Sequence, residues 1–222
     1  MSFNLDAPPN FVGLRPDLPL RIYHRRLPHW RQHGATYFVT FRLADAIPQQ
    51  QLRSLKRWRE IWERENSEPR TGEQWRSFAK EITTRTEKWL DEGYGECELA
   101  KPEIAALMKD SLLKFQQDRY FVSCIEIMPN HVHVVMRPLG IHQLETILKN
   151  MKGFVARQTN KILNREGTFW EPESYDRIIR DEEHLYRVVQ YIGRNARIAG
   201  LPESCWHRWL CPEWRDAGWQ FE

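Results

Sequence analysis

Two histidines separated by one residue are the clearest candidates for chemistry in this sequence. They lie in the segment MPNHVHVVMRP, where His131 and His133 alternate with Val132, Val134 and Val135. Residues two apart in a β-strand share a face, so the imidazoles would project together while the valines turn into the core. Two imidazoles on a rigid strand form half of a metal site, because ligation requires a third group from elsewhere. The alternative is that both are ordinary polar residues on a half-exposed strand.

A helical pattern near the C-terminus could supply the third group. In the stretch DEEHLYRVVQYIGRNARIAGL, Tyr191 and Asn195 are four residues apart and would stack on one helical face. Asn195 can offer a carbonyl oxygen to a metal, and Tyr191 can offer a phenol to a substrate beside it. The alternative is that Tyr191 is a core aromatic, because Val188 and Ile192 are close by.

Size and composition are those of a globular protein with one sizeable core. The chain has 222 residues, of which 41% are hydrophobic and 28% charged. No apolar run approaches the length of a membrane span, and the first twenty residues lack the basic and apolar regions of a signal peptide. We therefore expect a cytoplasmic protein with no membrane partner.

The four cysteines contain no CxxC pair, which predicts free thiols in a reducing compartment. They are Cys97, Cys124, Cys205 and Cys211. A zinc site at Cys205, His207 and Cys211 is the alternative, but that spacing fits no common zinc finger.

Positive charge is gathered in two segments. Residues 15–33 hold five arginines and one aspartate, and residues 146–165 hold five basic residues and no acid. Residues 53–98 instead hold ten basic and eleven acidic residues. Such a distribution is expected for a protein that binds a polyanion such as nucleic acid, although one charge cluster alone is usually a solvated helix face.

The order of predicted elements indicates an α+β fold. Strands are predicted at 35–43, 120–127, 131–136 and 174–180, and helices at 101–117, 142–164 and from Asp181 toward Gly200. The short turn at Met128–Asn130 makes the second and third strands an antiparallel hairpin. The order β-α-β-β-α-β-α is that of a ferredoxin-like split βαβ sheet with one added C-terminal helix, in a single domain spanning 1–222.

Three segments lie outside that pattern. Residues 1–34 read as a basic N-terminal arm, 49–92 as a helical insertion of two amphipathic helices, and 201–222 as a Trp-rich tail that could wrap over the body. The insertion has nearly balanced charge, so its tryptophans are expected to pack between its helices rather than stack on bases. Its self-contained periodicity predicts that joining Ala46 to Glu96 would preserve the fold.

In combination, several motifs carry a family resemblance. They are RRLPHWRQHGATYFVTFRLAD, WLDEGYGECEL, MPNHVHVVMRP, LKNMKGFVARQTN, GTFWEPESYDRIIRDEEH and YIGRNARIAGL, and they span most of residues 24–201. With these motifs the chain resembles the HUH single-strand endonucleases, and more closely the REP-associated tyrosine transposases, relatives of bacterial single-strand insertion-sequence transposases. The chain departs from the pattern of the family at Glu171, Arg177 and Ala196, where Gln, His and Pro are common.

The resemblance implies an activity and a set of site residues. The implied protein is a metal-dependent nuclease and strand-transferase for single-stranded DNA at REP-type hairpins, which works through a 5′-phosphotyrosine. Tyr191 would be the catalytic nucleophile, and His131, His133 and Asn195 would hold Mg²⁺ or Mn²⁺. The protein would be a bacterial, nucleoid-associated monomer or weak dimer.

Basic residues of the charged segments and of the fourth strand are the candidates for DNA contact. They are Arg25, Arg26, Lys149, Lys152, Arg157, Arg177 and Arg180. Two functions of other classes stay open, and both can be tested. One is a hairpin-binding protein without catalysis, and the other is a zinc-dependent hydrolase that uses the histidine pair and forms no covalent adduct.

Overall fold

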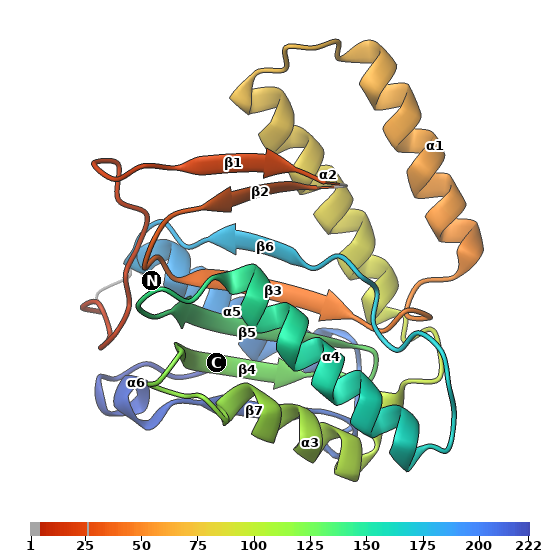
Figure 1. Cartoon of the computed structure of the whole chain (residues 1–222), viewed down its shortest axis with the longest axis vertical. Coiled ribbons are helices and arrows are strands. Elements are labelled where there is room, and N and C mark those ends of the chain that lie inside the picture. The colour runs from red at the N-terminus through yellow and green to blue at the C-terminus, as the bar shows by residue number, and fades with distance from the viewer. Residues whose placement is uncertain (1–4, 26) are drawn as a thin grey trace.

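Five antiparallel strands form the central sheet, in the order β6-β3-β5-β4-β7 (Figure 1). The structure is a computed structural model that describes residues 5–25 and 27–222. The strands are β3 (Tyr37–Arg42), β4 (Tyr120–Ile127), β5 (His131–Pro138), β6 (Tyr175–Ile178) and β7 (His207–Leu210). With the helices between them, β3 to β6 follow the β-α-β-β-α-β order of a ferredoxin-like fold, which confirms the predicted fold class.

Helices cover both faces of this sheet. In Figure 1, α3 (Pro102–Leu113) and α4 (Leu144–Ile162) lie in front of the strands and α5 (Glu182–Ile198) lies behind them. The predicted cap of α5 is present, because the Asp181 carboxylate accepts a hydrogen bond from the His184 amide at 2.7 Å.

The two faces of the sheet carry separate apolar clusters. Val132 and Val134 belong to the larger cluster beneath α3 and α4, as the alternation predicted. Val135 belongs with Phe38 to the smaller cluster beneath α5. Val135 therefore shares the face of the histidines, and the expectation that all three valines point away from them is wrong for this residue.

Part of the expected N-terminal arm is a β-hairpin. Strands β1 (Arg21–His24) and β2 (Pro28–Arg31) pair antiparallel as a separate two-stranded sheet. The local pattern of basic and aromatic residues did not indicate this pairing, because the hairpin is anchored by distant acidic residues described below.

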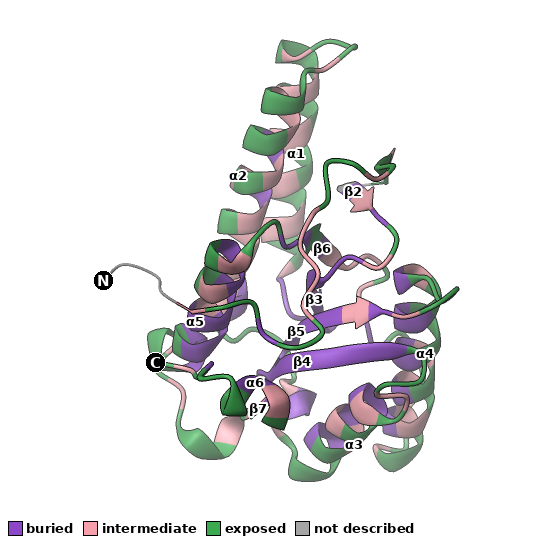
Figure 2. Ribbon diagram, turned by 90° about the vertical axis from the view of Figure 1, so that its left-hand side faces the viewer, coloured by how far each residue is buried: buried purple, intermediate pink, exposed green. Residues whose placement is uncertain are grey.

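The segment 49–92 forms the predicted pair of helices, α1 (Gln49–Glu65) and α2 (Gly72–Asp91). Figure 2 shows this pair projecting from the body, with its far end largely exposed and the central sheet buried. Three tryptophan rings pack around Phe78 with centroid distances of 5.5, 4.4 and 5.6 Å, namely Trp58, Trp62 and Trp75. These rings stabilise the contact between the helices, as expected from the balanced charge of the segment.

The base of the helical pair is part of the main core. Ile47 and Leu90 are buried in the large cluster beneath α3 and α4. The Asn130 amide nitrogen also donates to the carbonyl oxygens of Leu90 and Tyr94, both at 3.2 Å. These contacts argue against the expectation that Ala46 can be joined to Glu96 without loss of the fold, because that deletion would open the core and remove both partners of Asn130.

Replacement of Leu90 by alanine should destabilise the whole protein. Leu90 is 3% exposed, and truncating a buried leucine costs about 2–5 kcal/mol through lost burial and the cavity left behind. Urea unfolding followed by circular dichroism measures the change. Ile61→Ala in the same helical pair, where the side chain is 39% exposed, is the matched control and should cost far less. Equal losses in the two variants would contradict the assignment of Leu90 to the core.

The tail does return to the body, and it adds a strand to the sheet. Two short 3-10 helices lie elsewhere in the chain order, η1 (Glu98–Ala100) before α3 and η2 (Glu203–Cys205) before β7. In the tail, β7 pairs with β4 and leads into α6 (Pro212–Asp216). The buried indoles of this tail hold the N-terminal segment: Trp214 donates to the Pro9 carbonyl at 2.9 Å and Trp219 to the Asp6 carbonyl at 3.2 Å.

Candidate functional site

The face of β5 that carries the two histidines is buried. His131 is 1% exposed and His133 is fully buried, because α5 packs over this part of the sheet. The alternative of two ordinary polar residues on a half-exposed strand is therefore wrong about their exposure. Buried imidazoles need partners for both ring nitrogens, and those partners define what the pair can do.

The neighbouring strands place polar side chains on either side of His133. In the strand register Thr40 of β3 and Glu126 of β4 lie directly opposite His133. The register of β4 shifts between Val122 and Cys124, so Ser123 is a bulge that puts Glu126 on the histidine face. Sequence reasoning missed both neighbours, since alternation in one strand does not give its pairing with the next.

The Nδ1 atoms of both histidines are occupied. His131 Nδ1 lies 2.8 Å from Asn130 Oδ1, and His133 Nδ1 lies 2.8 Å from Thr40 Oγ1. Because the Asn130 amide nitrogen is held by two backbone carbonyls, its oxygen must face His131, and Nδ1 of that ring must donate. The remaining nitrogen of His131, Nε2, is then a lone-pair acceptor.

The Nε2 atoms converge on each other and on the predicted amide. They are 3.0 Å apart, and Asn195 Nδ2 lies 3.0 Å from His133 Nε2 and 3.4 Å from His131 Nε2. Rotating the Asn195 side-chain amide by 180° exchanges its nitrogen and oxygen, which have nearly the same shape, and so directs the oxygen at both rings. The helix continues past Asn195 to Ile198 without the proline common in the family, and Asn195 still reaches both rings.

The chemistry of these donors fits a divalent cation. Burial lowers the pKa of His131 to about 3 and holds the pKa of His133 well below its usual range, helped by His131, so both rings are neutral and able to act as ligands. No group of three or more His, Cys, Asp or Glu side chains within residues 5–25 and 27–222 could hold a metal, which includes the alternative at Cys205, His207 and Cys211. The Asn195 amide, which contacts both Nε2 atoms, is the candidate for the third donor.

Tyr191 lies beside this cluster, one helical turn before Asn195. Its ring is edge-on to His133 at a centroid distance of 5.4 Å and to Phe38 at 6.0 Å. Burial raises the pKa of the phenol above its usual range, and the carboxylates of Glu87 and Asp91 raise it further. Both carboxylates belong to α2, and sequence reasoning did not find their effect on the phenol.

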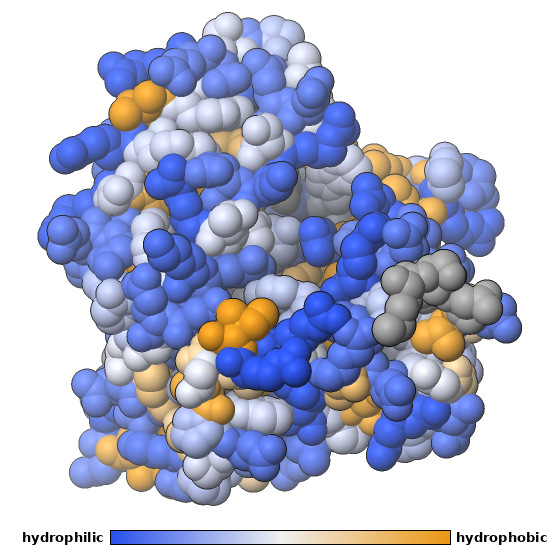
Figure 3. Space-filling model, turned by 180° about the vertical axis from the view of Figure 1, so that it is seen from behind, coloured by the Kyte–Doolittle hydropathy of each residue, from blue (hydrophilic) through white to orange (hydrophobic). Residues whose placement is uncertain are grey.

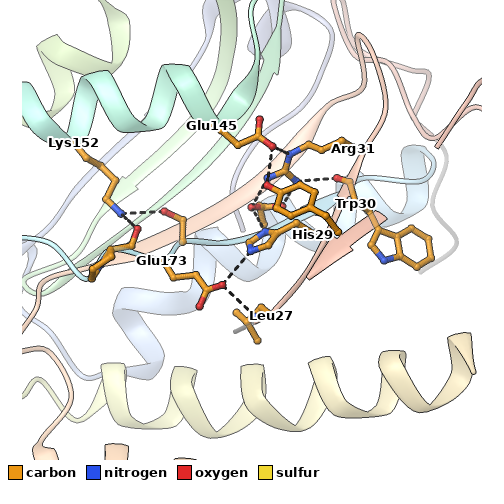
Figure 4. Close-up of polar contacts among 11 residues, drawn as sticks. Leu27, His29, Trp30, Arg31, Glu145, Lys152 and Glu173 are labelled. Carbon is orange, nitrogen blue, oxygen red and sulfur yellow. Dashed lines mark hydrogen bonds and ion pairs between the residues drawn. The ribbon is translucent and has the colours of Figure 1, made fainter. Parts of the chain in front are cut away.

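The side chain of Lys152 is buried and forms its hydrogen bonds inside the protein. Its ammonium donates to the carbonyl oxygens of Glu171 at 2.8 Å and Pro172 at 3.3 Å and to Ser174 Oγ at 3.2 Å (Figure 4). Burial lowers the pKa of Lys152 to about 8. The side chain is 8% exposed, so we omit it from the proposed DNA-contacting set.

The β1–β2 hairpin is held by a second network, on β6. His29 Nδ1 lies 2.8 Å from Asp176 Oδ2, and Arg31 forms ion pairs with Asp176 and Glu145 (Figure 4). Burial opposes protonation of His29, but its bonds to Asp176 and Glu173 raise its pKa to about 9. The ring is therefore charged at neutral pH and belongs to this anchor.

The other predicted cations within the described residues are exposed, and they lie on different parts of the surface. Arg25 and Lys149 line a cleft of about 460 Å³ beside α4, on the side of the sheet opposite the histidines. Arg177 stands near the tyrosine, its guanidinium 5.8 Å from the centre of the Phe38 ring. Arg157 and Arg180 are exposed, and Arg26 lies outside the described residues. The rear face, on the α5 side, is largely hydrophilic (Figure 3).

None of the helices in the described part of the chain combines the length and apolar character needed to cross a membrane.

Comparisons with known proteins bear on this cluster. Residues 98–195 match the family model described as IS200-like transposases, and this segment contains both histidines, Tyr191 and Asn195. A REP-associated tyrosine transposase solved in complex with a REP hairpin is similar over 82% of this chain and 75% of that one, with a TM-score of 0.44 and 16% identity. A search of curated proteins gives no significant match. Residues 98–195 are thus similar to IS200-like transposases, the broader group toward which the motifs pointed.

Proposed function

We propose that this chain, through its IS200-like transposase segment, is a metal-dependent endonuclease and strand-transferase for single-stranded DNA at REP-type hairpins. The observation that supports this most strongly is the convergence of the His131, His133 and Asn195 side chains beside the Tyr191 ring. We further propose that it acts in the bacterial cytoplasm, associated with the nucleoid.

The two histidines and Asn195 would hold Mg²⁺ or Mn²⁺, since a mixed nitrogen and oxygen donor set with open positions suits exchangeable divalent ions. The ion, when bound, would neutralise charge on the scissile phosphate. Asn130 and Thr40 keep the imidazoles in one orientation, so that both Nε2 atoms stay directed at the same point. A site fixed in this way needs no rearrangement of the histidines when DNA arrives.

Tyr191 would attack the phosphorus, forming a 5′-phosphotyrosine and releasing a 3′-hydroxyl. The covalent bond conserves the energy of the phosphodiester, so the 3′-hydroxyl of another strand can reverse the step and rejoin DNA without ATP. Because the nucleophile and the three donors come from one chain, the proposed site is complete in a monomer.

Exposed arginines in β6 and just after it would bind the DNA backbone. We propose this role for Arg177 and Arg180, and place Arg25, Lys149 and Arg157 in a second contact region near α4. Such contacts release counterions and make binding depend on salt.

Replacement of Arg177 by glutamine should weaken all hairpins about equally. Loss of one phosphate contact lowers the slope of log K against log salt by about 0.7 to 0.9. Fluorescence anisotropy at several salt concentrations, with two hairpins of different sequence, measures this slope. Arg76→Gln, an exposed arginine on the helical pair, is the control and should leave it unchanged. A change in hairpin preference without a change in slope would show that Arg177 reads bases instead.

A covalent adduct tests the proposed function. The protein is incubated with the hairpin repeats that flank its own gene, with Mg²⁺ or Mn²⁺ or with a chelator, and the products are resolved on a denaturing gel. A metal-dependent band of protein joined to DNA is expected. Tight binding without cleavage would favour a non-catalytic hairpin-binding protein, and cleavage without an adduct would favour a hydrolase that uses the histidine pair.

A further inference from the structure

Another cleft lies between α3 and α4, on the face of the sheet opposite the histidines. Its volume is about 510 Å³, and the two helices that flank it lie in front of the sheet in Figure 1. Its floor is part of the main core, since Tyr120, Ile147 and Met151 are buried in the cluster beneath these helices. A cleft of this size with a fixed apolar floor has the dimensions of a binding site.

Large apolar side chains also stand at the mouth of this cleft. Ile141 is 92% exposed and Phe154 is 37% exposed. Ile141 belongs to an ordered turn, in which the Leu139 amide donates to the Arg119 carbonyl at 2.9 Å and the His142 amide to the Leu139 carbonyl at 3.1 Å. The turn therefore holds an apolar side chain in water beside an apolar floor, an arrangement typical of interaction sites.

The charges at the rim of the cleft are positive. The Lys114 ammonium lies 5.8 Å from the ring centres of both Phe115 and Phe154, and the Arg119 guanidinium lies 3.8 Å from that of Phe115. Among the described residues, no aspartate or glutamate lines the cleft. Asp118 lies outside it and pairs with Arg119 at 3.7 Å, a long contact between exposed groups that neutralises little of the charge.

The N-terminal end of α4 adds to this positive field. Gln143 and Thr146 line the cleft there, and within the described chain no side chain caps the helix. Glu145, the acid of the first turn, is bonded to Tyr23 and Arg31. A helix N-terminus carries partial positive charge and N–H donors without helical partners, so this end of the cleft favours carboxylates.

We propose that this cleft binds a peptide segment of another protein, one in which bulky apolar side chains are flanked by acidic residues. The apolar side chains would lie on the floor beside Ile141, and the carboxylates would pair with Lys114 and Arg119. Single-stranded DNA fits the cleft less well, because its bases need open aromatic faces for stacking and the ring of Phe115 already carries a cation. The proposal does not depend on the DNA chemistry proposed above.

Fluorescence anisotropy with three synthetic peptides and the full-length protein tests this proposal. In the first peptide a Leu-Phe pair is flanked by glutamates, in the second the glutamates are replaced by lysines, and in the third the Leu-Phe pair is replaced by serines. We expect only the first to bind. Lys114→Glu should weaken it at least about 10-fold and strengthen binding of the lysine peptide, because like charges repel across an interface. Lys161→Glu makes the same change of charge at an exposed position of α4 outside the cleft, and should have no effect.

Ile141→Ser is a second variant that should leave the fold intact, because this side chain is almost entirely exposed. It should also bind the glutamate peptide at least about 10-fold more weakly, whereas Ile198→Ser, at a side chain 68% exposed, should bind as the wild type does. Failure of the wild type to bind the glutamate peptide would overturn the proposal, as would affinities that Lys114→Glu and Ile141→Ser leave unchanged. Loss of hairpin affinity in these two variants, with peptide affinity retained, would instead assign the cleft to DNA.

Discussion

Replacement of His133 by alanine is expected to abolish both Mn²⁺ binding and DNA cleavage. Its Nε2 is one of two neutral imidazole donors, 3.0 Å from His131 Nε2, and a single imidazole with one amide gives too few ligands to hold the ion. We expect Mn²⁺ affinity to fall by more than about 100-fold, by comparison with the 10–100-fold typical for loss of residues that only support a ligand. Electron paramagnetic resonance of free Mn²⁺ measures it directly.

The stability of this variant must be measured in the same preparation. His133 is buried, so alanine leaves Thr40 without its side-chain partner at a cost of about 1–3 kcal/mol. Hairpin affinity should stay close to that of the wild type, since the proposed phosphate contacts lie elsewhere. The same result is expected for His131→Ala, and a milder one for Asn195→Ala, because water can replace an amide ligand. Unchanged Mn²⁺ affinity in both histidine variants would make the pair purely structural.

Replacement of Tyr191 by phenylalanine is expected to eliminate the covalent adduct completely. The change removes only the phenol oxygen, so the ring keeps its edge contacts with His133 and Phe38 and the fold is preserved. Hairpin binding and Mn²⁺ binding should be retained. An oligonucleotide labelled at its 3′ end gives the readout, because the fragment joined through its 5′ phosphate then migrates with the protein on a denaturing gel.

A second tyrosine of α5 provides the matched control. Tyr186 is hydrogen-bonded to Glu222 near the C-terminus, so Tyr186→Phe alters the same helix away from the histidines and should retain the adduct. With a label at the 5′ end, the wild type and this control should instead release a shortened fragment that ends in a 3′-hydroxyl. An adduct that persists in Tyr191→Phe and disappears in Tyr186→Phe would assign the nucleophile to Tyr186.

Local patterns in the sequence were sufficient to predict the main elements. A period of two placed Val132 and Val134 on the opposite face of β5 from the two histidines, and a period of 3.6 placed Tyr191 and Asn195 on one face of α5. These inferences succeed because side-chain direction within one strand or helix depends only on backbone geometry. The order of these elements was likewise enough to indicate the ferredoxin-like sheet.

Burial could not be predicted in the same way. The sequence shows that Lys152 carries a charge, but its carbonyl partners come from the loop before β6, so its position inside the protein depends on how α4 packs there. The burial of the two histidines beneath α5 likewise depends on how distant segments pack together. Charge and periodicity are local properties, whereas exposure is decided by contacts between elements far apart in the chain.

The influence of Glu87 on Tyr191 was decided by tertiary structure alone. In the sequence Glu87 is one of many acids in a segment with nearly balanced charge, and nothing in its spacing separates it from its neighbours. Leu90, buried in the main core, fixes the last turn of α2, and that turn presents Glu87 to a helix that begins more than ninety residues later. The sequence thus specified the two histidines, the amide and the tyrosine, while long-range packing decided which carboxylates raise the pKa of that tyrosine.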